Sequence, residues 1–130
     1  MDQRHQQRIK LVQNLFAHSY KLPKNLPHPE LTKTQKILAK LGEIDELIKT
    51  HAPRYPLENI ARTDLSILRL SVYELIFEKK TPKKVTINEA VELAKQLSGE
   101  KSYAFINAVL GKILNHLESH TRGAVGDYAP

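Results

Sequence analysis

Two short groups of basic and aromatic residues carry the strongest chemical signal in this 130-residue chain. Arg4, His5 and Arg8 stand near the N-terminus, and guanidinium groups make paired hydrogen bonds to phosphate oxygens. Lys101 and Tyr103 stand nearer the C-terminus, and an exposed tyrosine ring can stack on an unpaired base. Each group taken alone is also typical of an ordinary solvated surface. Together they make nucleic-acid binding the chemistry to test.

Catalytic chemistry finds little support in the sequence. The chain has no glycine-rich phosphate loop, no HExxH helix and no GxSxG turn. His116 and His120 stand four residues apart, but only Glu118 accompanies them, so we expect no metal site. The absence of cysteine excludes disulfides, thiolate metal sites and cysteine nucleophiles. The sequence therefore predicts a protein that is not an enzyme, with no catalytic residue and no cofactor.

Several polar residues in apolar surroundings have structural explanations. Arg69 and Glu74 interrupt an otherwise apolar helix, and we expect them to form ion pairs with neighbouring helices. Asp64 falls at an exposed position in the first turn of the same helix, where a carboxylate complements the helix dipole. Thr86 and Glu89 have the spacing of a capping box, in which each side chain accepts a hydrogen bond from the other's backbone N–H.

Helical periodicity runs through every long segment and predicts an all-α fold. A first helix is expected over Arg4–Tyr20, and the proline-rich segment 21–31 is expected to be an extended linker. Thr63 and Thr86 are the expected N-caps of later helices, and Gly99 is an expected helix stop. A short helical turn is predicted at 57–61, and the further helices at 34–51, 63–78, 86–98 and 102–118.

The charge of the chain is +6, and the excess of basic residues is concentrated in residues 1–54. Such a bias favours a polyanionic partner through phosphate contacts, although many basic proteins have no nucleic-acid role. The N-terminus has no apolar signal-peptide core, and no apolar run approaches the ~20 residues that a membrane span needs. A cytoplasmic location is the simplest expectation.

Three ordered motifs resemble the NusB family of RNA-binding transcription antitermination factors. They are DLSILRLSVYEL at 64–75, VTINEAVELAK at 85–95 and FINAVLGKIL at 105–114. The segment IDELIKTHAPRYPL at 44–57 is also similar to the family, and the first helix is similar more weakly. Because the motifs occur in the family's order, the match is far more specific than any one of them alone.

The resemblance implies an all-helical fold of about six helices in two packed bundles. We expect one domain over residues 1–118, with bundles at about 1–52 and 57–118 and a flexible tail at 119–130. The resemblance also implies binding of single-stranded boxA RNA in ribosomal RNA leader transcripts, as a heterodimer with NusE, a small-subunit ribosomal protein. That complex joins RNA polymerase with NusA and NusG and suppresses premature termination without catalysis. Some relatives form homodimers that hide the RNA-binding face, so a homodimer is a further partner to test.

The family's functional positions can be carried over to individual residues. The RNA-binding residues are expected to be Arg4, His5, Arg8, Lys101, Ser102 and Tyr103. The acidic residue at the NusE contact falls on Asp64. We expect the side chains of Arg4 and Arg8 to project away from the apolar stripe of the first helix, toward one phosphate track.

Two other functions fit the same motifs. A NusB-like domain also forms the RNA-binding part of an rRNA cytosine methyltransferase, which would need a long C-terminal S-adenosylmethionine domain. A helical protein-interaction module that never touches RNA is the third reading. Salt-dependent binding to boxA RNA separates the antitermination factor from this last alternative.

Overall fold

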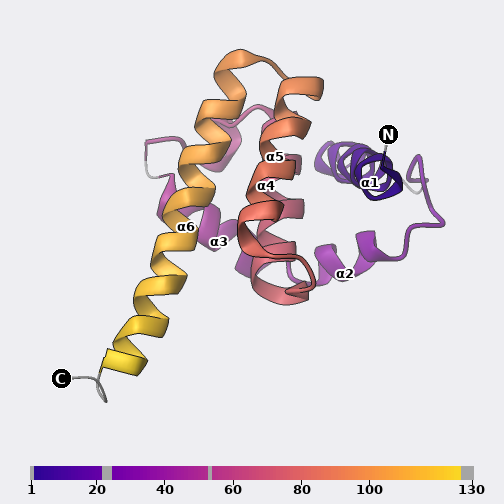
Figure 1. Cartoon of the computed structure of the whole chain (residues 1–130). Coiled ribbons are helices and arrows are strands. Elements are labelled where there is room, and N and C mark those ends of the chain that lie inside the picture. Colours follow the sequence, from indigo (N-terminus) through magenta and orange to yellow (C-terminus); the bar gives the residue numbers. More distant parts are fainter. Residues whose placement is uncertain (1, 22–24, 53, 127–130) are drawn as a thin grey trace.

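The computed structural model describes residues 2–21, 25–52 and 54–126, with side chains described up to residue 119. Within these ranges the chain forms helices and no strand, so the all-α prediction is confirmed (Figure 1). In chain order the elements are α1 (Gln3–Ser19), α2 (Lys33–Ala39), α3 (Leu41–His51), the 3-10 turn η1 (Leu57–Asn59), α4 (Arg62–Tyr73), the π-helical turn η2 (Glu74–Glu78), α5 (Lys83–Leu97) and α6 (Glu100–Gly126).

Helix α4 is the centre of the fold. Ile67, Leu68, Leu70 and Val72 lie on different sides of it, and each is fully buried. A helix that is apolar all round must be covered all round, and α4 packs against α1, α2, α3, α5 and α6. Burial of each such side chain contributes roughly 1.5–3 kcal/mol. The predicted division into two bundles stays a prediction, since both groups of helices share α4.

The segment predicted as one helix over 34–51 is two helices that meet at Lys40. Lys40 has φ −108° and ψ 12°, outside the helical range, and serves as the C-cap of α2 and the N-cap of α3. The break lets α2 pack against α1 while α3 packs against α4 and α6. The prediction of a continuous helix was wrong because these packing partners lie far away in the sequence.

The linker before α2 is tied to α1 by one buried amide. Asn14 is fully buried, donates from Nδ2 to the backbone carbonyl of His28 at 2.8 Å, and accepts from the backbone N–H of His28 at 2.8 Å. Its Nδ2 also donates to Thr34 at 2.8 Å. The predicted linker 21–31 lies partly outside the described residues, and its described part joins the two helices without a helix of its own.

The capping predictions were wrong in detail. Helix α5 begins at Lys83 with Pro82 as its N-cap, so Thr86 lies inside the helix, where its buried hydroxyl has no hydrogen-bond partner among the described residues. Thr63 does not cap α4 either, because that helix begins at Arg62 after Ala61. The stop at Gly99 is confirmed, since α5 ends at Leu97. Helix α6 continues to Gly126, past the predicted end.

The two polar interruptions of the α4 segment form ion pairs as predicted. Arg69 donates from Nε and Nη2 to the two carboxylate oxygens of Asp45 on α3, at 2.9 and 3.0 Å. Glu74 begins η2, where the backbone N–H of Lys79 donates to the Glu74 carbonyl in a π-helical bond of 2.9 Å. Lys79 then ends the turn in the left-handed region, with φ 56°. This π turn brings Glu74 toward α1 and α2, where its partners lie.

Candidate nucleic-acid interface

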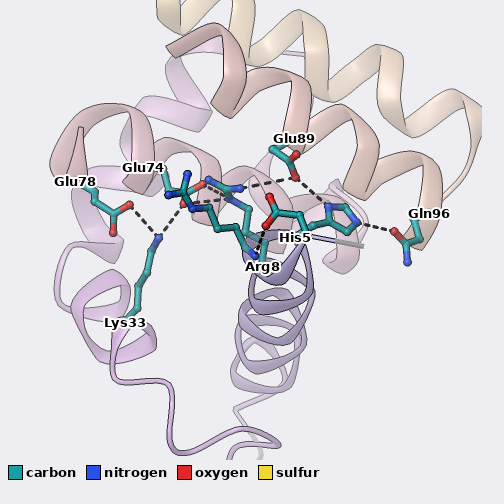
Figure 2. A network of polar contacts seen from close by, with 9 residues as sticks. His5, Arg8, Lys33, Glu74, Glu78, Glu89 and Gln96 are labelled. Carbon is teal, nitrogen blue, oxygen red and sulfur yellow. Dashed lines mark hydrogen bonds and ion pairs between the residues drawn. The ribbon is translucent and has the colours of Figure 1, made fainter. Parts of the chain in front are cut away.

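The start of α1 carries one buried and one exposed arginine. Arg8 is 7% exposed and donates from Nε to both carboxylate oxygens of Glu74, at 3.0 and 3.2 Å (Figure 2). Its Nη1 lies 3.8 Å from Glu89 on α5, and Lys33 Nζ lies 2.8 Å from Glu74 and 3.0 Å from Glu78. The expectation that Arg8 projects away from the core was wrong, because acidic side chains from η2 and α5 hold it between the helices.

His5 also joins α1 to α5, and it shares Glu89 with Arg8. Its Nδ1 lies 2.9 Å from Glu89 Oε2 and its Nε2 lies 2.8 Å from Gln96 Oε1, both on α5 (Figure 2). Two acceptors therefore face the ring, and only the protonated imidazole donates to both. The hydrogen bond to Glu89, followed by that to Gln96, raises the pKa of His5 above 6.5. Glu89 was expected to cap α5, and it instead contacts α1.

Arg4 is exposed and lines a cleft of about 610 Å³ between α1, α2 and η2. Lys36 and Lys80 are also exposed and line this cleft. Glu74 and Glu78 lie in it too, but ion pairs with Arg8 and Lys33 already engage their carboxylates. The outer cations are therefore available to a bound anion. Sequence analysis did not single out Lys36 or Lys80, although the basic loop KKTPKK at 79–84 was a usable signal.

Asp64, in the first turn of α4, holds the turn between α5 and α6 in place. Its carboxylate accepts hydrogen bonds from the Ser98 hydroxyl at 2.7 Å and from the Ser102 hydroxyl at 2.9 Å. Asp64 is 7% exposed, so the expectation of an exposed first-turn carboxylate was wrong. Lys101, next to Ser102, is exposed. Asp64 thus fixes the backbone that presents Lys101.

The last turns of α5 lie between the two predicted RNA-binding groups. Lys95 Nζ lies 5.1 Å from the ring centroid of Tyr103 on α6, within cation–π range, and its neighbour Gln96 contacts His5 on α1. Figure 1 shows α5 running alongside α6, with α1 on its other side. The structure therefore places His5 and Tyr103 on either side of one helix, while Arg8 is enclosed.

The described part of the chain offers no group of three or more histidine or acidic side chains placed to hold a metal ion. Among the same residues, no helix combines the length and apolar character required to cross a bilayer.

Comparison with known proteins shows which family the chain belongs to. The model described as the NusB family matches residues 5–115. The chain belongs to the NusB family. Over 72 residues it is 57% identical to the transcription antitermination protein NusB of Clostridium botulinum (strain Kyoto / Type A2). The matched segment covers 55% of this chain and 50% of that relative. The chain therefore spans about half the length of this curated relative.

Solved structures share the NusB fold. T. maritima NusB superposes with a TM-score of 0.72 at 29% identity, covering 86% of this chain and 90% of the other. A structure of the antitermination factors NusB and NusE in complex with dsRNA contains a chain that superposes with a TM-score of 0.68, covering 88% of this chain and 99% of that one. Its identity of 23% shows a common fold alone.

Proposed function

We propose that this protein is a transcription antitermination factor that binds boxA-type single-stranded RNA of ribosomal RNA leader transcripts together with NusE. Family membership supports the proposal, and the curated relatives carry the name transcription antitermination protein NusB. The observation that carries it is the surface around the end of α5, where the start of α1 and the start of α6 bring basic and aromatic groups to either side of one helix. Such a surface binds and positions RNA; we assign it no catalytic step.

The groups on this surface have different tasks. Arg4 and Lys101 are exposed cations that suit phosphate oxygens, and phosphate contacts do not read sequence. Tyr103 is partly exposed and suits stacking on an unpaired base, which contributes to preference among RNAs. The hydrogen bonds from His5 to Glu89 and Gln96 raise its pKa and so favour its positively charged form, and Ser102 fixes the turn through Asp64. Arg8 acts on RNA only indirectly, by holding α1 in place.

The proposed protein partners are those expected from the resemblance to the NusB family. We propose that Asp64 and the start of α4 contribute to the contact with NusE, and that the heterodimer acts in the cytoplasm within an RNA polymerase elongation complex that also contains NusA and NusG. A homodimer that covers the RNA-binding surface is a further proposal. Because Asp64 is mostly buried, its contribution to NusE binding is the shape of the α4–α6 surface more than an open charge.

Binding of labelled boxA RNA to the purified chain, with and without NusE, tests this function. Fluorescence anisotropy at several salt concentrations should show that the heterodimer prefers boxA RNA over a scrambled RNA by about tenfold or more. The logarithm of the affinity should fall with the logarithm of the salt concentration by roughly 0.7 for each phosphate contacted. Equal and salt-independent affinity for both RNAs would reject the proposal and favour a protein-interaction module that does not use RNA.

A further inference from the structure

A second, smaller hollow lies where the loop after α3 and η1 meets the first turns of α4 and α6. Its volume is about 200 Å³, and it is lined in part by Tyr55, Asn59, Asp64, Lys101 and Phe105. We call it the Tyr55 hollow. Sites for drug-sized ligands and cofactors occupy roughly 300–1,000 Å³. The Tyr55 hollow is below that range, so it suits one ring system and not a whole cofactor.

Tyr55 stands at this hollow as a held but accessible aromatic ring. It is 50% exposed, although large aromatic side chains are usually well covered. Its ring packs edge to face against Phe105 on α6, with centroids 5.1 Å apart and planes at 73°. Its backbone N–H donates to the Ala52 carbonyl at 3.1 Å, which ties Tyr55 to the end of α3. The ring is therefore already ordered, and stacking on it costs little conformational entropy.

The charges around the hollow suit a nucleotide. Lys101 lines it from the first turn of α6, and Arg54, the residue before Tyr55, is also exposed. Cations beside an aromatic ring are the arrangement that binds single-stranded nucleic acid, with phosphates on the cations and a base on the ring. Asp64 also lines the hollow, and its carboxylate accepts the two serine hydroxyl hydrogen bonds that hold the α5–α6 turn in place.

We propose that the Tyr55 hollow holds one unpaired base of the bound RNA, stacked on Tyr55, with Lys101 and Arg54 at the adjoining phosphates. This site rests on the RNA binding proposed above and extends it from the α5–α6 turn to Arg54 and Tyr55, which were not predicted from the sequence to bind RNA. Phe105 and Asp64 are positioning residues here: Phe105 holds the ring, and Asp64 holds the turn that presents Lys101.

An abasic scan of the RNA tests the site. In the heterodimer with NusE, the affinity of the unchanged chain is measured for boxA RNA and for a series in which one base at a time is removed. One position should weaken binding by about tenfold. Tyr55→Ala should bind intact RNA about tenfold more weakly and should show no further loss at that position. Tyr55→Phe should restore the loss, because a phenylalanine ring also stacks.

Two controls separate the hollow from the rest of the surface. Tyr20→Ala removes another exposed tyrosine, 44% exposed at the end of α1 and outside the hollow, and should leave the abasic profile unchanged. Tyr55→Ala should also keep the salt slope of the unchanged chain, since no phosphate contact is removed.

The outcomes distinguish this site from the proposed function. If the unchanged heterodimer binds no boxA RNA, the proposed function fails and the hollow fails with it. If it binds normally and Tyr55→Ala keeps the full abasic profile, only the hollow is rejected. If Tyr55→Ala no longer binds NusE in a pull-down but binds RNA with the same affinity as the unchanged chain, the hollow receives a protein side chain. The nucleobase proposal is then overturned.

Discussion

Replacing Arg8 and Arg4 separately is the sharpest test of how α1 works, because the two arginines stand one turn apart in opposite surroundings. Arg8→Ala removes a buried guanidinium that forms two hydrogen bonds with Glu74, whose side chain is 4% exposed. Breaking a buried pair by removing one partner costs about 3–5 kcal/mol. Lys33 still lies 2.8 Å from Glu74, so the lower end of that range, about 3 kcal/mol, is expected.

Urea unfolding followed by circular dichroism measures this loss, and a thermal melt provides a second reading. For a chain of this length, 1 kcal/mol corresponds to roughly 4 °C, so the Tm of Arg8→Ala should fall by about 12 °C. Arg4→Ala should change the free energy of unfolding by less than about 0.5 kcal/mol, because Arg4 is exposed. It should instead reduce the salt slope of RNA binding by about 0.7 if it contacts one phosphate.

A double variant separates charge from packing in this network. Arg8→Met with Glu74→Leu removes both charges together, and should lose less stability than Arg8→Ala alone because no carboxylate is left without its main partner. The reasoning is refuted if Arg8→Ala unfolds at the same urea concentration as the unchanged chain and weakens RNA binding as Arg4→Ala does. Arg8 would then be a surface RNA contact, as the sequence alone predicted.

Two further predictions concern groups near the RNA-binding surface. Because the pKa of His5 is raised, its protonated form stabilises the fold fully below pH 6.5, and this contribution is lost as the pH rises through the folded pKa. The stability difference between the unchanged chain and His5→Gln should therefore shrink in urea titrations as the pH is raised above 6.5; a difference that grows with pH would contradict the contact with Glu89. Asp64→Ala should cost about 1–3 kcal/mol by leaving the Ser102 hydroxyl without its acceptor, and should weaken RNA binding through the loosened turn. Calorimetry with NusE then shows whether Asp64 also supports the partner contact, and equal NusE affinity would reject that assignment.

Helical periodicity was enough to predict the class of fold and most of the helices. The pattern in α4 was clear because Ile67, Leu68, Leu70 and Val72 place apolar side chains on several sides of the helix, and such a helix has to be central. Sequence could not show the break at Lys40, because the break depends on which helices α2 and α3 pack against. The capping box at Thr86 failed for a related reason: a Thr-x-x-Glu spacing also fits the inside of a helix, and Pro82 starts α5 one turn earlier.

The candidate site was predicted by residue type but not by exposure. Arg8 and Glu74 are 66 residues apart, and nothing local to Arg8 reveals that Glu74 covers it. Asp64 was placed correctly in a first turn, but the serines that cover it come from α5 and α6. Tyr55 lies in a segment that is similar to the family, but no role was predicted for its ring, since a tyrosine in a proline-containing loop has no periodic pattern. Family motifs identified the chain, whereas the burial of these side chains required the packed structure.

Mapping the RNA on the isotopically labelled chain tests the central claim most directly. In the complex with unlabelled NusE, boxA RNA is added and the amide resonances of the chain are followed by NMR. The account predicts that the largest RNA-induced changes fall at the start of α1 around Arg4 and His5 and at the start of α6 around Lys101, Ser102 and Tyr103. Changes confined to other helices, with both of these segments unaffected, would contradict an RNA-binding surface built from α1 and the α5–α6 turn.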